Sequence, residues 1–218
     1  MSDPLRIVSL IPLSPTDRDA ITATAGVAEL TMVDGWFDGE LRTSWGDYVA
    51  DSYLRPGSIG ERTRAERDSV LATADVVFGG FPMPVDLVGR ASQLKWVHQT
   101  PAGASNLRKC DLWGSDVTVT TSRGLGNTLA IAEYVVAAFA HFARGLHRAH
   151  LDAAGGTFDR FAYRPIQLAG KRVCVVGAGG IGQDVGRLCA ALGMDVVGTR
   201  RTVGESLPEG FNRVGPPS

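Results

Sequence analysis

The chain has 218 residues, 44% of them hydrophobic and 21% charged, which is enough apolar content to bury a core. The 22 lysines and arginines are balanced by 23 acidic residues, and the formal net charge of −1 argues against general nucleic-acid binding. The best apolar run, residues 129–140, is interrupted by Glu133, and no secretory signal precedes it, so neither a membrane span nor export is expected. Cys110, Cys174 and Cys189 form no CxxC pair, which favours a reduced, cytoplasmic protein over a disulfide or zinc scaffold.

Short apolar runs alternate with amphipathic stretches in the first hundred residues, a pattern typical of parallel βα units. Ser14-Pro-Thr-Asp17 predicts a helix start, with a hydroxyl cap, a first-turn proline and an acid near the positive end of the helix dipole. Residues 34–60 have no clear period and predict a long loop with one short helix. Strands are expected at 6–11, 27–33, 75–79 and 94–98, and further helices at 61–73 and 85–91.

A second part of the chain begins near Thr100. Residues 117–120 alternate as a strand does, and a long helix is predicted over 127–147. Its apolar residues recur at steps of 3 and 4 and predict one buried stripe, as in a structural spine or a subunit contact. The residues of this stripe are Leu129, Ala132, Val136, Phe139, Ala143 and Leu146. This helix is the reason for expecting a homodimer.

A glycine-rich turn follows the apolar strand predicted at 172–176 and precedes a helix and a strand at 195–199. A GxGxxG in this setting is typical of a dinucleotide-binding βαβ unit. The first glycine permits the tight turn, the second lets the backbone approach a pyrophosphate, and the third lets the helix pack close to the strand. Free N–H groups at the helix start then point at the phosphates. The residues expected to bind the cofactor here are Gly177, Gly179, Gly180, Ile181 and Gly182. A glycine-rich turn that binds nothing is the alternative.

The end of the second strand bears on the choice of cofactor. An NAD site has an acid about 20 residues after the motif, to accept hydrogen bonds from the ribose 2′-hydroxyl. The chain has Arg200, Arg201 and Thr202 instead, which offer donors and positive charge to a 2′-phosphate. This favours NADP(H), while NAD(H) stays possible if the two arginines are solvated surface residues.

Four stretches resemble the D-isomer-specific 2-hydroxyacid dehydrogenases in order and spacing. Residues 94–104 are similar to the family's substrate loop, and 117–124 to the strand that enters its cofactor domain. Residues 127–134 resemble its hinge helix, and 170–198 its glycine-rich unit. The resemblance implies an α/β protein with a flavodoxin-like substrate-binding domain at 1–100 and a Rossmann-type NAD(P)-binding domain at 101–218.

The resemblance also implies hydride transfer between a nicotinamide and a 2-keto or 2-hydroxy acid. The substrate carboxylate would be held by the backbone amides of Ala102, Gly103 and Ala104, an arrangement that can bind an anion without titrating. Ser105 stands where the family often has Asp. The family's catalytic Arg, Glu and His come later, so they are expected beyond Ser218, and the cofactor domain is expected to stop, truncated, after its second strand.

The glycine motif also has other interpretations. A non-catalytic dinucleotide-binding or sensing module would keep the glycine motif without turnover, and a methyltransferase would use another adenine ligand, although the paired arginines suit a phosphate better. The histidines are weaker candidates: His98 ends a strand beside the substrate loop, and the spacing of His147 and His150 falls short of a metal site without nearby acids or cysteines. Glu133 is expected to act as a helix residue near the hinge rather than as a base. If the later strands are absent, the exposed apolar strands predict poor solubility or reliance on a partner.

Overall fold

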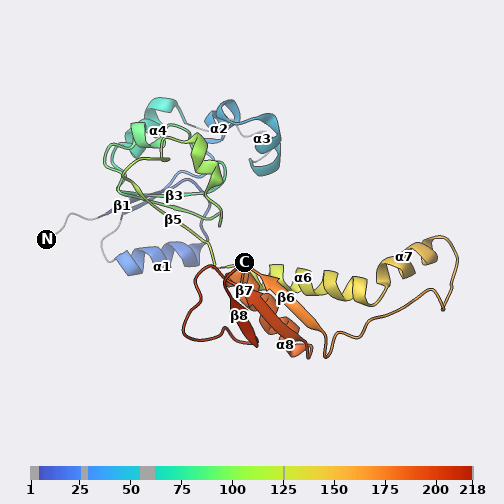
Figure 1. Ribbon diagram of the computed structural model, residues 1–218. Helices are drawn as coiled ribbons and strands as arrows, with labels where there is room; N and C mark the ends of the chain where they lie inside the picture. Colours follow the sequence, from blue (N-terminus) through green and yellow to red (C-terminus); the bar gives the residue numbers. More distant parts are fainter. Residues whose placement is uncertain (1–4, 26–28, 55–61, 125, 218) are drawn as a thin grey trace. The chain divides into compact units, whose positions relative to one another are not determined.

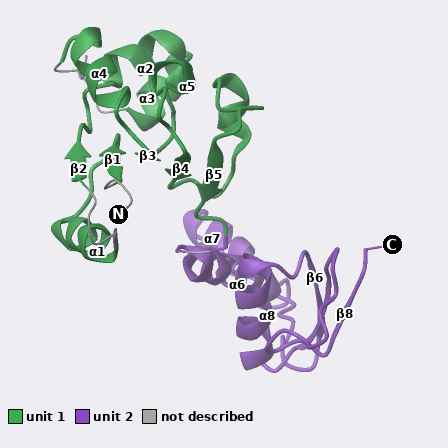
Figure 2. Ribbon diagram, turned by 90° about the vertical axis from the view of Figure 1, so that its left-hand side faces the viewer, with its two compact units in different colours: residues 1–123 green, residues 124–218 purple. Residues whose placement is uncertain are grey.

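The computed structural model describes residues 5–25, 29–54, 62–124 and 126–217. The chain forms two compact units, Met1–Arg123 and Gly124–Ser218 (Figure 2). This division falls later than the expected boundary at residue 100. The reason is that the strand Thr118–Thr121 pairs with Trp96–Gln99 and so completes the first sheet instead of opening the second unit.

Unit 1 is built on a five-stranded sheet in the order β2-β1-β3-β4-β5, and all of its pairings are parallel. This is the order of flavodoxin-like folds. The expected α/β class is confirmed. The strands are β1 (Arg6–Ser9), β2 (Glu29–Met32), β3 (Val76–Gly79), β4 (Trp96–Gln99) and β5 (Thr118–Thr121).

The helices of unit 1 leave one face of the sheet better covered than the other. α1 (Pro15–Ala25) lies on one side of the sheet, whereas α2 (Asp38–Ser44) and α4 (Arg64–Leu71) lie on the other (Figure 1). The main core forms on the α4 side, where Val8, Val77 and Val97 of the strands are buried with Phe37, Leu71 and Leu87. α3 (Asp47–Tyr53), α5 (Leu87–Arg90) and the 3-10 helix η1 (Ser105–Lys109) complete the unit. The segment expected to hold one short helix therefore contains α2 and α3; its residues 55–60 lie outside the described residues, as do 27 and 28 of the expected second strand.

A buried cluster of charges joins three helices of unit 1. The carboxylate of Glu40 on α2 contacts the guanidinium groups of Arg67 on α4 and Arg90 on α5, and both arginine side chains are less than a tenth exposed. Burial opposes the charge of Arg90, but hydrogen bonds to Asp68 and Glu40 hold its pKa above the ordinary value. Both guanidinium groups also lie near the ring of Phe37, 5.8 and 5.6 Å from its centroid. The cluster thus fixes how α2, α4 and α5 sit together.

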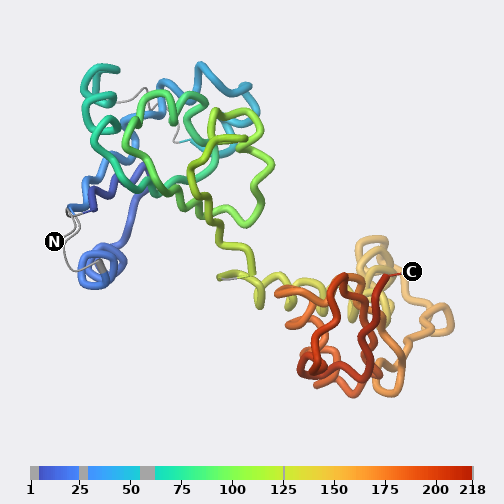
Figure 3. The backbone as a smooth tube through the Cα atoms, turned by 60° about the vertical axis from the view of Figure 1, so that its left-hand side comes forward, coloured from blue at the N-terminus to red at the C-terminus, as the bar shows by residue number. Residues whose placement is uncertain are grey.

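Unit 2 has a three-stranded parallel sheet in the order β6-β7-β8. Its strands are β6 (Arg172–Val176), β7 (Asp195–Thr199) and β8 (Arg213–Gly215), and its helices α6 (Thr128–Ala143), α7 (Leu146–Ala154) and α8 (Gly180–Ala191). β8 corrects the expectation that the sheet ends after its second strand. This strand has three residues and little signal in the sequence. Its packing comes from Phe211, just before it, whose ring lies where side chains at Gly186 and Gly198 would be. The backbone trace in Figure 3 follows the connection from α7 to β6.

The long helix predicted over 127–147 is divided. α6 ends at Ala143 and α7 begins at Leu146, with a bend of 68° at Gly145, whose φ is +70°. The predicted buried stripe is also corrected: Ala132 is buried in the core of unit 2, whereas Phe139 and Leu146 are 40% and 50% exposed. No single helix in the described ranges is long and apolar enough to span a membrane; α6 and α7 pass together, by length and composition only.

Candidate functional site

The glycine-rich turn lies between β6 and α8 and is held to the end of β7. The N–H groups of Gly177 and Ala178 both donate to the carbonyl oxygen of Thr199, at 3.1 and 2.8 Å. Gly177 has φ +97°, a conformation that favours glycine, and Gly179 caps α8 without any side-chain hydrogen bond. The first N–H groups of α8 are therefore not capped by a side chain and can donate to an anion.

The remaining glycines of the turn meet different surroundings. A Cβ at Gly182 would lie 2.1 Å from the carbonyl oxygen of Gly177, so only glycine lets α8 pack this closely. A Cβ at Gly179 would meet nothing within 4 Å, which leaves open space on the side where a phosphate would approach. The donors and the open backbone fit a dinucleotide pyrophosphate.

Arg200 and Arg201 follow directly after β7, on the same edge of the sheet as the turn. The backbone N–H of Arg200 donates to the carbonyl oxygen of Gly215 in β8, which anchors this segment. Within the described part of the chain, neither guanidinium has an ion pair or side-chain hydrogen bond, and Arg201 and Thr202 are exposed. Both guanidinium groups are thus available to a phosphate.

The loop after β4 forms a separate candidate site in unit 1. The buried Gln99 side chain donates to the carbonyl oxygen of Gly103 at 2.7 Å and accepts from Asn106 at 3.0 Å. The hydroxyl of Thr121 donates to the carbonyl oxygen of Ala102 at 3.2 Å. Toward the described residues, the N–H groups of Ala102, Gly103 and Ala104 make no hydrogen bond. The loop is therefore held through its carbonyls while three consecutive N–H groups remain available, as binding of a carboxylate requires.

The structure gives His98 and Glu133 no part in either candidate site. His98 lies within β4, on the sheet face opposite the core residue Val97, where it packs against Phe78 at 5.7 Å between ring centroids. Its Nδ1 is 2.9 Å from the hydroxyl of Thr120. Glu133 is exposed on α6.

The other histidines and the cysteines are also apart from the candidate sites. The rings of His141 and His147 lie 5.9 Å apart, but no group of three potential ligands that could hold a metal ion occurs among the described residues. All three cysteines are free thiols. Burial raises the pKa of Cys110 to about 11, so its thiol stays protonated and unreactive near neutral pH.

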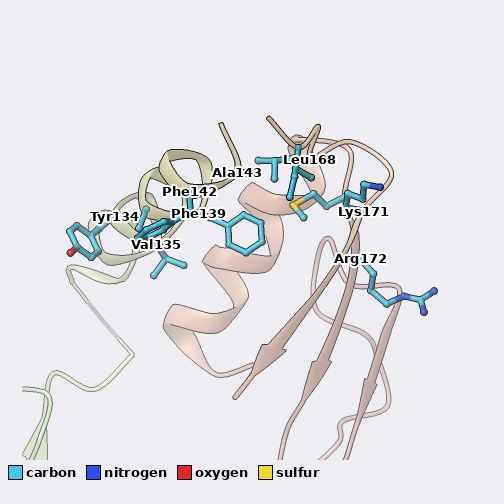
Figure 4. A pocket seen from close by; sticks show the side chains of 11 residues that line it. Tyr134, Val135, Phe139, Phe142, Ala143, Leu168, Lys171 and Arg172 are labelled. Carbon is cyan, nitrogen blue, oxygen red and sulfur yellow. The ribbon is translucent and has the colours of Figure 1, made fainter. Parts of the chain in front are cut away.

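An apolar cavity of about 700 Å³ lies in unit 2, away from the glycine-rich turn. Figure 4 shows Tyr134, Phe139 and Phe142 of α6 along it, opposite Leu168. Lys171 and Arg172 are the charged residues among those that line it. Its chemistry suits protein packing better than a dinucleotide, which needs donors for its phosphates.

Residues 136–214, which hold the glycine-rich turn, β6, β7 and the start of β8, match the D-isomer specific 2-hydroxyacid dehydrogenase, NAD binding domain. Most of unit 2 is thus similar to that family's NAD-binding domain, as the resemblance of residues 170–198 implied.

The curated relatives of this chain are longer than it is, and each match covers part of both proteins. The D-3-phosphoglycerate dehydrogenase of Methanocaldococcus jannaschii is 28% identical over 145 residues, which cover 62% of this chain and 26% of that protein. The (S)-sulfolactate dehydrogenase of Chromohalobacter salexigens is 30% identical over 112 residues, 51% of this chain and 36% of that one. The chain therefore spans about a quarter to a third of the length of these relatives.

Solved structures agree in fold. A D-isomer specific 2-hydroxyacid dehydrogenase of Xanthobacter autotrophicus Py2, in complex with NADPH and MES, has a TM-score of 0.63 at 19% identity. The similarity covers 99% of this chain and 58% of that one. A family protein of Aeromonas salmonicida has the same TM-score, covering 97% of this chain and 57% of that one. Both units of this chain thus share the fold of these two structures.

Sequence reasoning missed two residues that shape these sites. Gln99, which positions the substrate loop, is the last residue of β4 and lies between the polar residues His98 and Thr100, so the sequence pattern does not single it out. Phe211 lies in a segment without periodicity, and only the glycines that face it reveal its place.

Proposed function

We propose that this chain supplies the substrate-binding and NAD(P)-binding parts of a 2-hydroxyacid dehydrogenase that prefers NADP(H). The observation that carries the proposal is the pairing of an uncapped glycine-rich turn with two unpaired arginines at the end of the next strand. The turn would hold the pyrophosphate through the N–H groups of Gly180 and Ile181. Arg200 and Arg201, with the hydroxyl of Thr202, would hold the 2′-phosphate.

The bound nicotinamide would supply the hydride, and unit 1 would bind the acid. The free N–H groups of Ala102, Gly103 and Ala104 would bind the substrate carboxylate, and the contacts made by Gln99 and Thr121 would keep them pointing toward it. A 2-keto or 2-hydroxy acid is the substrate class that such a loop suits. We assign no acid–base residue among the described residues of either candidate site.

The cofactor preference is tested by titrating the chain with NADPH and NADH and following the nicotinamide fluorescence. NADPH should bind at least about tenfold tighter than NADH, and Arg200→Ala should remove most of that difference while changing NADH affinity less than about twofold. Arg187→Ala, which removes a half-exposed arginine on α8, is the matched control and should change neither. Equal affinities for the two cofactors would overturn the preference, and no binding of either would overturn the cofactor site itself.

A non-catalytic dinucleotide-binding module is the second candidate, because the glycine-rich turn and the two arginines after β7 would bind a dinucleotide whether or not turnover follows. The two are separated by mixing the chain with NADPH and glyoxylate, hydroxypyruvate or phenylpyruvate. Any sustained NADPH oxidation above the rate of a Gly182→Ala control contradicts the binding module.

We further propose a homodimer, supported by the exposed apolar side chains of α6, and a cytoplasmic location, supported by three free cysteines.

A further inference from the structure

The strand order of unit 1 creates a crevice beside β1 and β3. From β1 the chain crosses to β2 on one side, and from β3 it crosses to β4 on the other. The loops that leave the carboxyl ends of these two neighbouring strands therefore part in opposite directions. In open parallel sheets, ligands bind in the crevice formed at such a switch point.

A cavity of about 250 Å³ occupies this position. Ile11, after β1, and Gly80 and Phe81, after β3, line it together with Tyr53 and Leu54 at the end of α3. Asp38 is the one carboxylate among its lining residues, and no lysine or arginine of the described chain lines it. An uncharged, apolar group would be accommodated there at low cost, whereas an anion would lose water without gaining a cation.

Phe81 is held in place on one wall of this crevice. Its ring packs edge-on against Tyr53, at 4.6 Å between centroids, and against Trp45, at 5.4 Å. Trp45 is itself buried and donates from its indole N–H to the carbonyl oxygen of Met83 at 3.1 Å. A wall ordered in this way needs little rearrangement when a ligand packs against it.

The crevice adjoins the loop proposed to bind the carboxylate. The N–H of Thr100 donates to the carbonyl oxygen of Gly79 at 3.0 Å, which joins the starts of the two loops. A Cβ at Gly80 would lie 2.8 Å from Ile11 and 3.8 Å from the Thr100 hydroxyl, so Gly80 lies between a residue of the crevice and the first residue of that loop. An acid held by the loop could thus extend its side chain into the crevice.

We propose that the crevice formed by Ile11, Tyr53, Gly80 and Phe81 receives the side chain of the 2-oxo acid and selects uncharged aliphatic or aromatic side chains. This inference rests on the proposed function, because it uses the loop at Ala102–Ala104 as the carboxylate site. It separates this chain from the relatives named for phosphoglycerate and sulfolactate, whose acids carry a second anion.

The test measures equilibrium binding to the full chain by ligand-observed NMR, with NADPH present. Phenylpyruvate and 4-methyl-2-oxopentanoate should bind at least about tenfold tighter than 3-phosphohydroxypyruvate or 3-sulfopyruvate, and tighter than glyoxylate, which has no side chain. Tyr53→Arg places a cation at the mouth of the crevice and should reduce that ratio at least about tenfold. Tyr48→Arg is the matched control, since Tyr48 is exposed on the same helix and does not line the crevice.

Different binding results would overturn the crevice as a side-chain site and the loop as the carboxylate site. Binding of the phosphorylated or sulfonated acid as tight as that of phenylpyruvate overturns the selection, as does an equal effect of the two arginine variants. Binding of all 2-oxo acids with the affinity of glyoxylate leaves the carboxylate loop in place and overturns the crevice as a side-chain site. If glyoxylate and every other acid fail to bind while NADPH binds, the substrate loop of the proposed function is wrong, and the crevice proposal falls with it.

Discussion

At the residue scale, two glycines of one motif are required for different physical reasons. Gly182 is fixed by packing, because a methyl group there would lie 2.1 Å from a backbone oxygen that cannot move aside without moving the turn. Gly179 has open space around it and an ordinary φ of −92°, so nothing in the chain itself requires glycine there. The remaining reason for a glycine at that point is the approach of a ligand to the backbone.

Paired substitutions separate these two reasons. Gly182→Ala should lower the free energy of unfolding by about 2 kcal/mol and abolish NADPH binding, because α8 must move away from β6. Gly179→Ala should change the free energy of unfolding by less than about 1 kcal/mol and still weaken NADPH binding at least about tenfold. Urea unfolding and NADPH titration of both variants check this. NADPH binding of Gly179→Ala at wild-type strength would show that the pyrophosphate does not approach that position.

At the element scale, charge as well as apolar packing joins the helices of unit 1. α2, α4 and α5 are short, and Glu40 lies among them with Arg67 and Arg90. Removing one member of a buried ion cluster leaves the other charges without compensation, which costs more than the pair itself contributes. The pair of Lys95 and Asp75 differs in this respect, because Lys95 is 69% exposed and Asp75 keeps a hydrogen bond from the N–H of Arg6 when the lysine is removed.

This difference predicts unequal effects of two substitutions. Glu40→Gln keeps the volume of the side chain but removes its charge, and should lower the free energy of unfolding by about 3 kcal/mol. Lys95→Ala should lower it by less than about 1 kcal/mol. Chemical denaturation followed by tryptophan fluorescence measures both. Equal losses for the two variants would mean that the cluster is hydrated and does not hold the helices together.

Element predictions succeeded where the pattern was local and failed where it depended on packing. The βαβ unit around the glycine-rich turn was predictable because an apolar strand, three glycines and a helical period follow one another directly. The break after Ala143 was missed because the apolar spacing continues through Gly145, whose φ of +70° ends the helix regardless of that spacing. β8 was missed because three residues carry no period, and its place comes from pairing with β7.

At the scale of the whole molecule, the apolar surface of α6 predicts self-association. Tyr134 and Phe142 are 76% and 66% exposed and lie along the 700 Å³ cavity. Large exposed apolar side chains gathered on one helix are typical of a protein interaction surface. A second copy of the chain could cover it through a two-fold arrangement of the same face.

Sedimentation equilibrium tests this prediction. The chain should be dimeric, and Phe142→Glu should raise the dimer dissociation constant at least about tenfold without unfolding unit 2, because the side chain is exposed in the single chain. Tyr48→Glu, at an exposed aromatic residue of unit 1, is the control and should leave the dissociation constant unchanged. A wild-type chain that sediments as a monomer at micromolar concentration contradicts the prediction.

The sequence by itself determined the α/β class, the glycine-rich turn and the residues around it, because each rests on interactions between neighbours in the chain. Strand propensity, the turn glycines and the two arginines at 200 and 201 are all visible within about 30 residues. Only the tertiary structure decided where the first unit ends, which strands pair, and that Gln99 holds the substrate loop. The crevice between β1 and β3 also belongs to this second group, since its walls lie far apart in sequence and meet only when the sheet has formed.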